Sequence, residues 1–220
     1  MNVEDYFKNI LWDPAAIEHT SMAEIDHYIE GLSLDVGEKS VVKRVVHTSG
    51  DPSLAPLVKF HPQAMMAGLT ALKGGATVFT DVNMVRAGIN LKRLRQYGGT
   101  VRCAVFRQEV AQAAKDWEIT RSAAAMRLFG SKLDNQLVAI GNAPTALFEV
   151  LRMVEEKLIK PALIVGVPVG FVGAAESKEL LTKFDIPYIT LPGTRGGSPL
   201  AAAIVNALIY LLEEDYCGQS

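Results

Sequence analysis

The chain has 220 residues, of which 49% are hydrophobic and 21% are charged. This length allows one sizeable core, and this composition is typical of a soluble globular domain rather than of a disordered or collagen-like chain. The formal net charge of −2 and the pI near 6.1 argue against bulk binding of nucleic acid, which usually needs a basic domain. We therefore expect a single domain over residues 1–220 that binds neither nucleic acid nor a membrane.

The cysteine content and the lengths of the apolar runs indicate the cellular compartment in which the protein is expected. Cys103 and Cys217 are the only cysteines, too few for a disulfide framework or a cysteine-rich zinc site. The first eleven residues have no continuous apolar run and do not resemble a secretory signal. The most apolar stretches, residues 161–175 and 199–212, are shorter than the roughly 20 residues that a membrane span needs. We expect reduced cysteines and a cytoplasmic protein.

The first 75 residues have the spacing of apolar side chains that is typical of helices. Helices are predicted over residues 15–30, 38–47 and 62–72, and no strand is expected before residue 76. This part of the chain should pack its helices against a sheet formed by the residues that follow.

From residue 76 onward, short β-branched runs alternate with helical patterns, which is typical of successive β-α units around a parallel sheet. The runs are continuously apolar, as expected for strands that are covered on both faces. The predicted strands are residues 76–81, 100–105, 136–140, 162–167 and 188–191. The sequence thus predicts an α/β fold, a mostly parallel open sheet of about five strands with helices on both faces and a helical N-terminal part.

Turn-forming residues follow three of these strands, at residues 81–84, 141–144 and 168–170. Open sheets of this kind bind ligands beyond the carboxyl ends of their strands, so these segments are candidates for a binding site. Glycine and proline can also do no more than form the turn between a strand and a helix. Three such segments together favour a site.

Arg44 and His47 are three residues apart in a predicted helix, so they lie on one face. They would present a fixed cation beside a group that titrates near neutral pH, which suits an anionic substrate that needs proton transfer. Gly50, Asp51 and Pro52 then end the helix, which leaves His47 in its last turn. The alternative is a surface histidine at a helix end, and these residues alone leave it open.

The familiar patterns of metal and nucleotide sites are absent from the sequence. The histidines have no close pairing that would place two ligands on one face, and no Gly-x-Ser-x-Gly or phosphate-loop motif occurs. Gly166, Gly170 and Gly173 have the wrong spacing for a dinucleotide loop. We expect no metal site and no cofactor.

Between Asp81 and Glu109 there is no acidic residue, although this stretch contains Arg86, Lys92, Arg93, Arg95, Arg102 and Arg107. Such a basic zone on a slightly acidic protein could steer a polyanion towards a site. It could equally be a solvated face or a weak nucleic-acid patch. The scarcity of aromatic residues there argues against base stacking.

Two predicted helices begin next to an arginine. Arg121 and Ser122 open an alanine-rich helix, and Arg195 precedes the last helix, where Ser198 is expected to cap and Pro199 to occupy the first turn. Arginine forks and free helix N–H groups both bind carboxylates. Plain helix capping remains the alternative.

Several longer blocks of the chain resemble the precorrin-8X methylmutase family. The resemblance runs from about residue 17 to residue 208, nearly the whole chain. It is carried by residues 43–48, 141–147, 166–172 and 176–179, and by the shorter segments 120–122, 196–198 and 206–208. Blocks of this length are specific, and they favour a catalytic role for His47 over the surface alternative.

The resemblance implies an isomerase of corrin-ring biosynthesis, part of the route to cobalamin. It would move a methyl group from carbon 11 to carbon 12 of precorrin-8X or cobalt-precorrin-8, giving hydrogenobyrinate or cobyrinate. The family's active-site histidine falls on His47, and its substrate-contacting positions fall on Ser21 and Arg44. Met22 follows Ser21 where many relatives have phenylalanine, so an aromatic contact is lost. The family also implies a homodimer with its site near the subunit interface and no cofactor.

A polycarboxylated tetrapyrrole needs cations and helix N-termini for its carboxylates and apolar side chains for its flat ring. On this basis the predicted substrate-binding residues are Ser21, Arg44, Thr48, Met84, Arg121, Ser122, Asn142, Lys178 and Arg195. The alternative is a non-catalytic corrinoid or tetrapyrrole binding protein on the same fold. The pairing of His47 with Arg44 favours catalysis, because binding alone requires cations but no titratable group.

Overall fold

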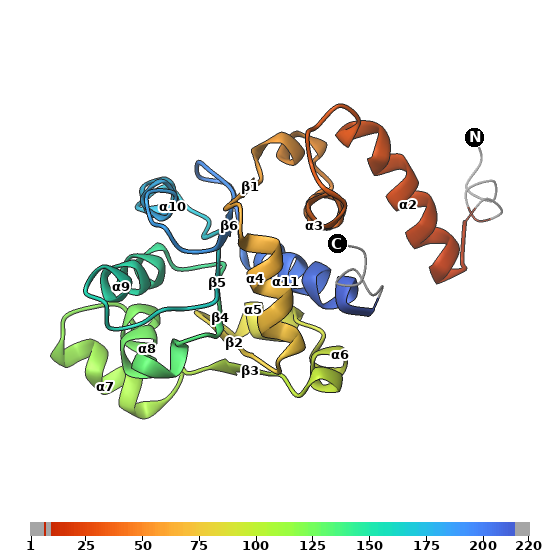
Figure 1. Ribbon diagram of the computed structural model, residues 1–220. Helices are drawn as coiled ribbons and strands as arrows, with labels where there is room; N and C mark the ends of the chain where they lie inside the picture. Colours follow the sequence, from red (N-terminus) through yellow and green to blue (C-terminus); the bar gives the residue numbers. More distant parts are fainter. Residues whose placement is uncertain (1–6, 8–9, 214–220) are drawn as a thin grey trace.

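The computed structural model of the protein describes residue 7 and residues 10–213. Its centre is a six-stranded sheet with helices on both faces, in the strand order β1-β6-β5-β4-β2-β3 (Figure 1). The strands are β1 (Lys59–Phe60), β2 (Thr77–Thr80), β3 (Thr100–Cys103), β4 (Leu137–Ile140), β5 (Leu163–Gly166) and β6 (Tyr188–Thr190). The predicted open, mostly parallel α/β sheet is confirmed, and so are its five expected strands.

The edge strand β1 corrects one expectation, because a strand does precede residue 76. Its two residues pair antiparallel with β6, whereas the other neighbouring strands pair in parallel. A strand this short has no alternating pattern that a sequence could reveal. It exists because Lys59 and Phe60 align with Thr190 and Ile189 of β6.

Eight helices form the two layers that cover the sheet, and each layer has its own apolar core. One layer consists of α3 (Val36–Ser49), α4 (Ala64–Lys73), α5 (Asn83–Gly88) and α11 (Ser198–Glu213). The other consists of α7 (Gln108–Asp116), α8 (Arg121–Phe129), α9 (Pro144–Glu155) and α10 (Ala174–Leu181). Shorter elements connect them, namely α6 (Leu91–Leu94) and the 3-10 turns η1 (Pro52–Leu57), η2 (Arg95–Tyr97) and η3 (Gly130–Leu133).

Helix α11 is the most deeply buried helix of its layer. Twelve of its 16 residues are buried, which is typical of a helix inside a core rather than on a surface. It packs against α3, α4 and α5 and also reaches β4 and β5. Helix α3 therefore lies against α11 instead of directly on the sheet (Figure 1).

The ends of α3 are well defined by local chemistry. Asp35 accepts a hydrogen bond from the backbone of Glu38, and the Glu38 side chain accepts one from the backbone of Asp35, which is a capping box. At the other end Gly50 adopts a left-handed conformation with φ of 64°. The buried side chains of α3 are valines, and the helix packs against α11 and η1. His47, in the last turn, is exposed.

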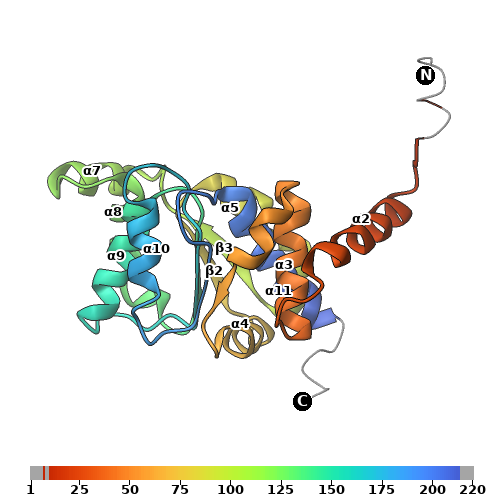
Figure 2. The ribbon, with the colours of Figure 1, turned by 90° about the horizontal axis from the view of Figure 1, so that it is seen from above.

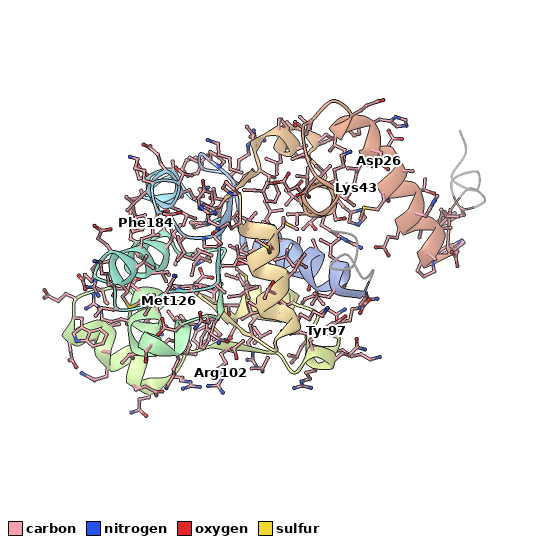
Figure 3. The ribbon with its side chains drawn as sticks, viewed as in Figure 1. Asp26, Lys43, Tyr97, Arg102, Met126 and Phe184 are labelled. Carbon is pink, nitrogen blue, oxygen red and sulfur yellow. The ribbon has the colours of Figure 1, made fainter. Side chains whose placement is uncertain are left out.

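Helix α2 (Pro14–Ile29) projects from the body of the protein (Figure 2). Among its residues only Ile25 and Ile29 are buried. It is held to α3 by an ion pair in which Lys43 Nζ lies 2.8 Å from the Asp26 carboxylate (Figure 3). Much of the surface of α2 is therefore free of contact with the rest of this chain.

The start of α11 corrects the expectation that Ser198 caps it. The carbonyl of Gly197 accepts the first helical hydrogen bond, from Ala201 N at 3.0 Å, so Gly197 precedes the helix and Ser198 lies in its first turn. Ser198 Oγ is buried and has no hydrogen-bond partner. Pro199 lies in the first turn, as predicted.

No helix in the described part of the chain is both long enough and apolar enough to cross a membrane.

Gly141 lies where β4 meets the start of α11, and a side chain there has no space. A Cβ atom would lie 2.7 Å from Ser198 Cα and 2.9 Å from side-chain atoms of Val85 and Ala201. Gly141→Ala should therefore lower the free energy of unfolding by about 1–3 kcal/mol, measured by urea denaturation. Gly74→Ala, whose Cβ would meet its neighbours at 3.4 Å, is the control. Equal urea midpoints for the two variants would contradict this packing.

Candidate active site

Asp81 organises the carboxyl edge of the sheet. It follows β2, is fully buried, and accepts hydrogen bonds from the backbone N–H groups of Gly141 at 3.2 Å, Asn142 at 2.8 Å and Ala143 at 2.7 Å. Burial raises the pKa of the Asp81 carboxyl, while these three hydrogen bonds act in the opposite direction. The carboxylate thus ties the end of β2 to the loop that follows β4.

A second set of bonds holds the segment before α11 against the end of β5. Gly197 N donates to the Val167 carbonyl at 2.9 Å, and Gly170 N donates to the Thr194 carbonyl at 3.0 Å. Lys178, which is 1% exposed, donates from Nζ to the Arg195 carbonyl at 2.6 Å. Burial lowers the pKa of Lys178 to about 8.

Arg195 connects this segment to the end of α3. Its guanidinium donates to Asp51 Oδ2 and to Ser53 Oγ, each at 2.8 Å. Hydrogen bonds from Ser53 and the charge of Arg195 hold the pKa of the Asp51 carboxyl below its usual value. A pocket of about 330 Å³ lies here, and Thr48, Val169 and Arg195 are among its lining residues.

His47 and Arg44 line one pocket of about 490 Å³, as their helical spacing predicts. Helix α3 supplies both side chains, and the exposed imidazole lies one turn beyond the guanidinium. Arg44 pairs with Glu18 of α2 and lies 4.8 Å above the ring centroid of Tyr210. The other lining residues are Pro14, Ile17, Glu18, Arg93, Tyr210 and Glu213.

The remaining predicted residues do not line either of these two pockets. Ser21 is partly buried on α2, Met84 is exposed on α5, and Arg121 is exposed at the first residue of α8. Asn142 is also exposed, in the loop that Asp81 holds. Ser122 is buried and its Oγ donates to the Asp81 carbonyl at 3.4 Å. The contact of each residue with a substrate stays a prediction.

Arg93 and Tyr210 are among the residues of the His47 pocket that the sequence did not identify as site residues. Arg93 was one of six cations in the basic zone, and nothing in the spacing distinguished it from the others. Tyr210 lies on α11, where most residues are apolar and buried. A half-buried phenol on this mostly apolar helix was the available signal for Tyr210.

A larger pocket, of about 990 Å³, lies between α8, α9 and α10 on the opposite face of the sheet. Its wall contains two cations, Arg152 and Lys183, against five acidic residues, Glu118, Glu149, Glu155, Glu156 and Asp185. This excess of negative charge would repel a polycarboxylate. The charge therefore favours the smaller His47 pocket, although it has half the volume.

Within the described residues, no group of three or more histidine, cysteine, aspartate or glutamate side chains is placed to hold a metal ion. The polar groups that line the His47 pocket are an imidazole, two guanidinium groups, a phenol and two carboxylates. Such a set can bind anionic groups and transfer a proton.

The chain matches the family model described as precorrin-8X methylmutase over residues 16–211. The chain belongs to the precorrin-8X methylmutase family. It is 38% identical over 213 residues to the cobalt-precorrin-8 methylmutase of Priestia megaterium, with 97% of this chain and 95% of the relative covered. It is 45% identical over 172 residues to the cobalt-precorrin-8 methylmutase of Methanocaldococcus jannaschii, covering 78% of this chain and 79% of the relative.

A solved structure supports the same family assignment. The precorrin-8X methylmutase from Thermus thermophilus superimposes with a TM-score of 0.84 at 35% identity, covering 91% of this chain and 97% of that one. The resemblance inferred from residues 43–48 and the other blocks is thus confirmed. As a member of the precorrin-8X methylmutase family, the protein is an isomerase that moves a methyl group within one molecule.

The buried amine of Lys178 should give the stability of the protein a distinct pH dependence. Its pKa falls from 10.5 to about 8 on burial, so between these values the unfolded chain binds a proton that the folded protein does not. Stability relative to Lys178→Met should therefore rise by up to roughly 3 kcal/mol as pH increases from 7 to above 10. Denaturant unfolding at several pH values measures this difference. Lys183→Met, at an exposed lysine, is the control. If the stability of both variants had the same pH dependence, the lowered pKa of Lys178 would be contradicted.

Proposed function

We propose that the protein converts precorrin-8X or cobalt-precorrin-8 into hydrogenobyrinate or cobyrinate by moving the methyl group of carbon 11 to carbon 12. This would make it an isomerase of cobalamin biosynthesis. The observation that carries the proposal is the pocket in which α3 places His47 beside Arg44, in a chain of the precorrin-8X methylmutase family. The same carboxylates are present on the metal-free and the cobalt-bearing substrate, so either form suits these cations.

His47 is the proposed acid–base residue. It donates a proton, or a strong hydrogen bond, to a ring nitrogen of the macrocycle and so draws electron density towards the carbon that receives the methyl group. Substrate and product are isomers, so the proton that His47 supplies returns to it when the rearrangement is complete. The imidazole is exposed and lines the pocket, so a ring nitrogen can reach it. No external methyl carrier enters this reaction, and we propose that it needs no cofactor.

The carboxylates of the substrate are assigned to polar side chains at the predicted positions. Arg44, Arg121 and Arg195 offer guanidinium forks, which bind carboxylates through paired hydrogen bonds. Ser21, Thr48 and Asn142 offer further hydrogen-bonding side chains. Arginine forks set the orientation of the macrocycle, because a bidentate bond fixes direction as well as distance.

The flat face of the ring is assigned to apolar side chains at the carboxyl edge. Met84 is 64% exposed and Phe171 is 94% exposed, which leaves both free to cover a ligand. Ser122 and Lys178 are buried and bond to backbone carbonyls. Their proposed contribution to substrate binding is to hold the edge loops that carry Asn142 and Arg195.

We also propose that the protein is a cytoplasmic homodimer with its site near the subunit interface. Helix α2 projects from the body (Figure 2). It displays Ile17 at 42% exposure, and Trp12, just before the helix begins, is 76% exposed. Large apolar side chains in such a position are typical of a surface that meets a partner. A second copy of the chain is the proposed partner, since most homo-oligomers are closed and symmetric.

His47→Ala should abolish rearrangement while fold and product affinity persist. Loss of a general acid typically costs about a hundred- to ten-thousand-fold in rate. The measurement is single-turnover conversion of precorrin-8X followed by its visible spectrum, with circular dichroism and hydrogenobyrinate affinity as checks. His27→Ala, at an exposed histidine of α2, is the matched control. A His47→Ala enzyme within about threefold of the wild-type rate would exclude His47 as the acid and favour a binding protein without catalysis.

Light scattering on the purified protein tests the dimer. At micromolar concentration the measured mass should be twice the 23.8 kDa of one chain. Trp12→Ser should shift the mass towards that of one chain at high dilution, because it removes exposed apolar surface from the proposed interface. A single-chain mass for the wild-type protein at micromolar concentration would refute the dimer.

A further inference from the structure

Two arginines from distant parts of the chain stack on the same tyrosine ring. Arg44 of α3 lies 4.8 Å from the ring centroid of Tyr210, and Arg93 of α6 lies 4.5 Å from it. Both guanidinium groups line the pocket that contains His47. Cation–π contacts of this kind hold a guanidinium in a fixed plane while its N–H groups stay available.

Arg93 is placed there by a specific set of hydrogen bonds. Asn206 of α11 accepts from Asn90 N and donates to the Gly88 carbonyl, each at 2.8 Å, so the link between α5 and α6 is fixed to α11. The side chain of Asn90 then accepts from Arg93 N at 3.2 Å and caps α6. Asn206 and Tyr210 lie one turn apart on α11, which brings Arg93 to the tyrosine ring.

Each of these arginines already holds a carboxylate. Arg44 pairs with Glu18 and Arg93 pairs with Glu213. The glutamate side chains are 53% and 33% exposed, and ion pairs in contact with water contribute little to stability. These two pairs can therefore exchange with other carboxylates at small cost.

We propose that Arg44 and Arg93, both stacked on Tyr210, form a clamp for two carboxylates of the substrate, and that Glu18 and Glu213 occupy the carboxylate positions until substrate displaces them. The proposal rests on the function proposed above and adds Arg93 and Tyr210 to the binding site. The clamp fixes one edge of the macrocycle beside His47, because Arg44, Arg93 and His47 line the same pocket. Arg93 binds substrate and takes no part in proton transfer.

The competing explanation is that the two ion pairs only hold the ends of the chain to the body. Glu18 belongs to the projecting helix α2, and Glu213 is the last described residue of α11. The two explanations predict opposite changes in substrate affinity when either glutamate is removed. In the clamp, a glutamate competes with substrate, so its removal strengthens binding; in a purely structural pair, its removal loosens the site and weakens binding.

The experiment measures hydrogenobyrinate affinity together with the KM and kcat for precorrin-8X. Arg93→Gln should raise the dissociation constant and KM by about tenfold or more, as expected for loss of a charge-assisted hydrogen bond, with kcat nearly unchanged. Arg93→Lys should restore part of the affinity, because the charge remains without the fork. Arg95→Gln is the matched control, an exposed arginine of the same basic zone. Glu213→Gln and Glu18→Gln should each tighten binding.

The outcomes separate the clamp from the function on which it rests. A wild-type protein that neither binds hydrogenobyrinate nor converts precorrin-8X overturns the proposed function and the clamp with it. An active wild type with equal affinities for Arg93→Gln and Arg95→Gln overturns the clamp alone. A Glu213→Gln protein that binds hydrogenobyrinate as weakly as Arg93→Gln also overturns the clamp, because a purely structural ion pair predicts that result.

Discussion

The burial of α11 between α3 and the sheet positions the side chains that α3, α6 and α11 supply to the His47 pocket. Along its length this helix packs the valines of α3, anchors the α5–α6 link through Asn206 and presents Tyr210 to two arginines. Helix α3, which carries Arg44 and His47, packs on α11, and the link that leads to Arg93 is hydrogen-bonded to α11 through Asn206. Apolar burial of this extent is the dominant force that keeps such a helix in place.

Polar contacts then fix the loops around this apolar support. The Asp81 carboxylate holds the backbone of residues 141–143, and Arg195 ties the segment before α11 to Asp51 at the end of α3. Both contacts join segments that are far apart in sequence, so the carboxyl edge of the sheet and the helix with His47 are connected directly. A site made of several loops depends on such connections, because exposed loops without them are mobile.

Much of the fold could be predicted from the residues because its signals are local. The apolar runs at β2 to β6, the capping residues of α3 and the pairing of Arg44 with His47 all depend on spacing within a few positions. The edge strand β1 escaped prediction, because its two residues become a strand only by pairing with β6. Ser198 was predicted as a cap, but α11 begins one residue earlier than predicted, so Gly197 takes that place.

The candidate site was predictable where the family motifs or helical spacing identified it, and not where distant segments meet. Arg93 reaches Tyr210 only because Asn206 holds the backbone near Asn90, and no pattern in the sequence indicates that contact. Likewise, Lys178 and Ser122 fit a carboxylate-binding motif by residue type, but both are buried and bonded to backbone carbonyls. The sequence shows which residue types can bind a carboxylate, but only the structure shows which of those side chains a substrate can reach.

We propose that the macrocycle binds on the face with Arg44 and His47 and not in the larger acidic pocket between α8, α9 and α10. A crystal structure of the protein with hydrogenobyrinate bound would decide between the two pockets. We expect a ring nitrogen within hydrogen-bond distance of His47 and a substrate carboxylate paired with Arg44. A macrocycle bound among Glu149, Glu155 and Lys183, or one whose carboxylates leave Arg44 paired with Glu18, would contradict it.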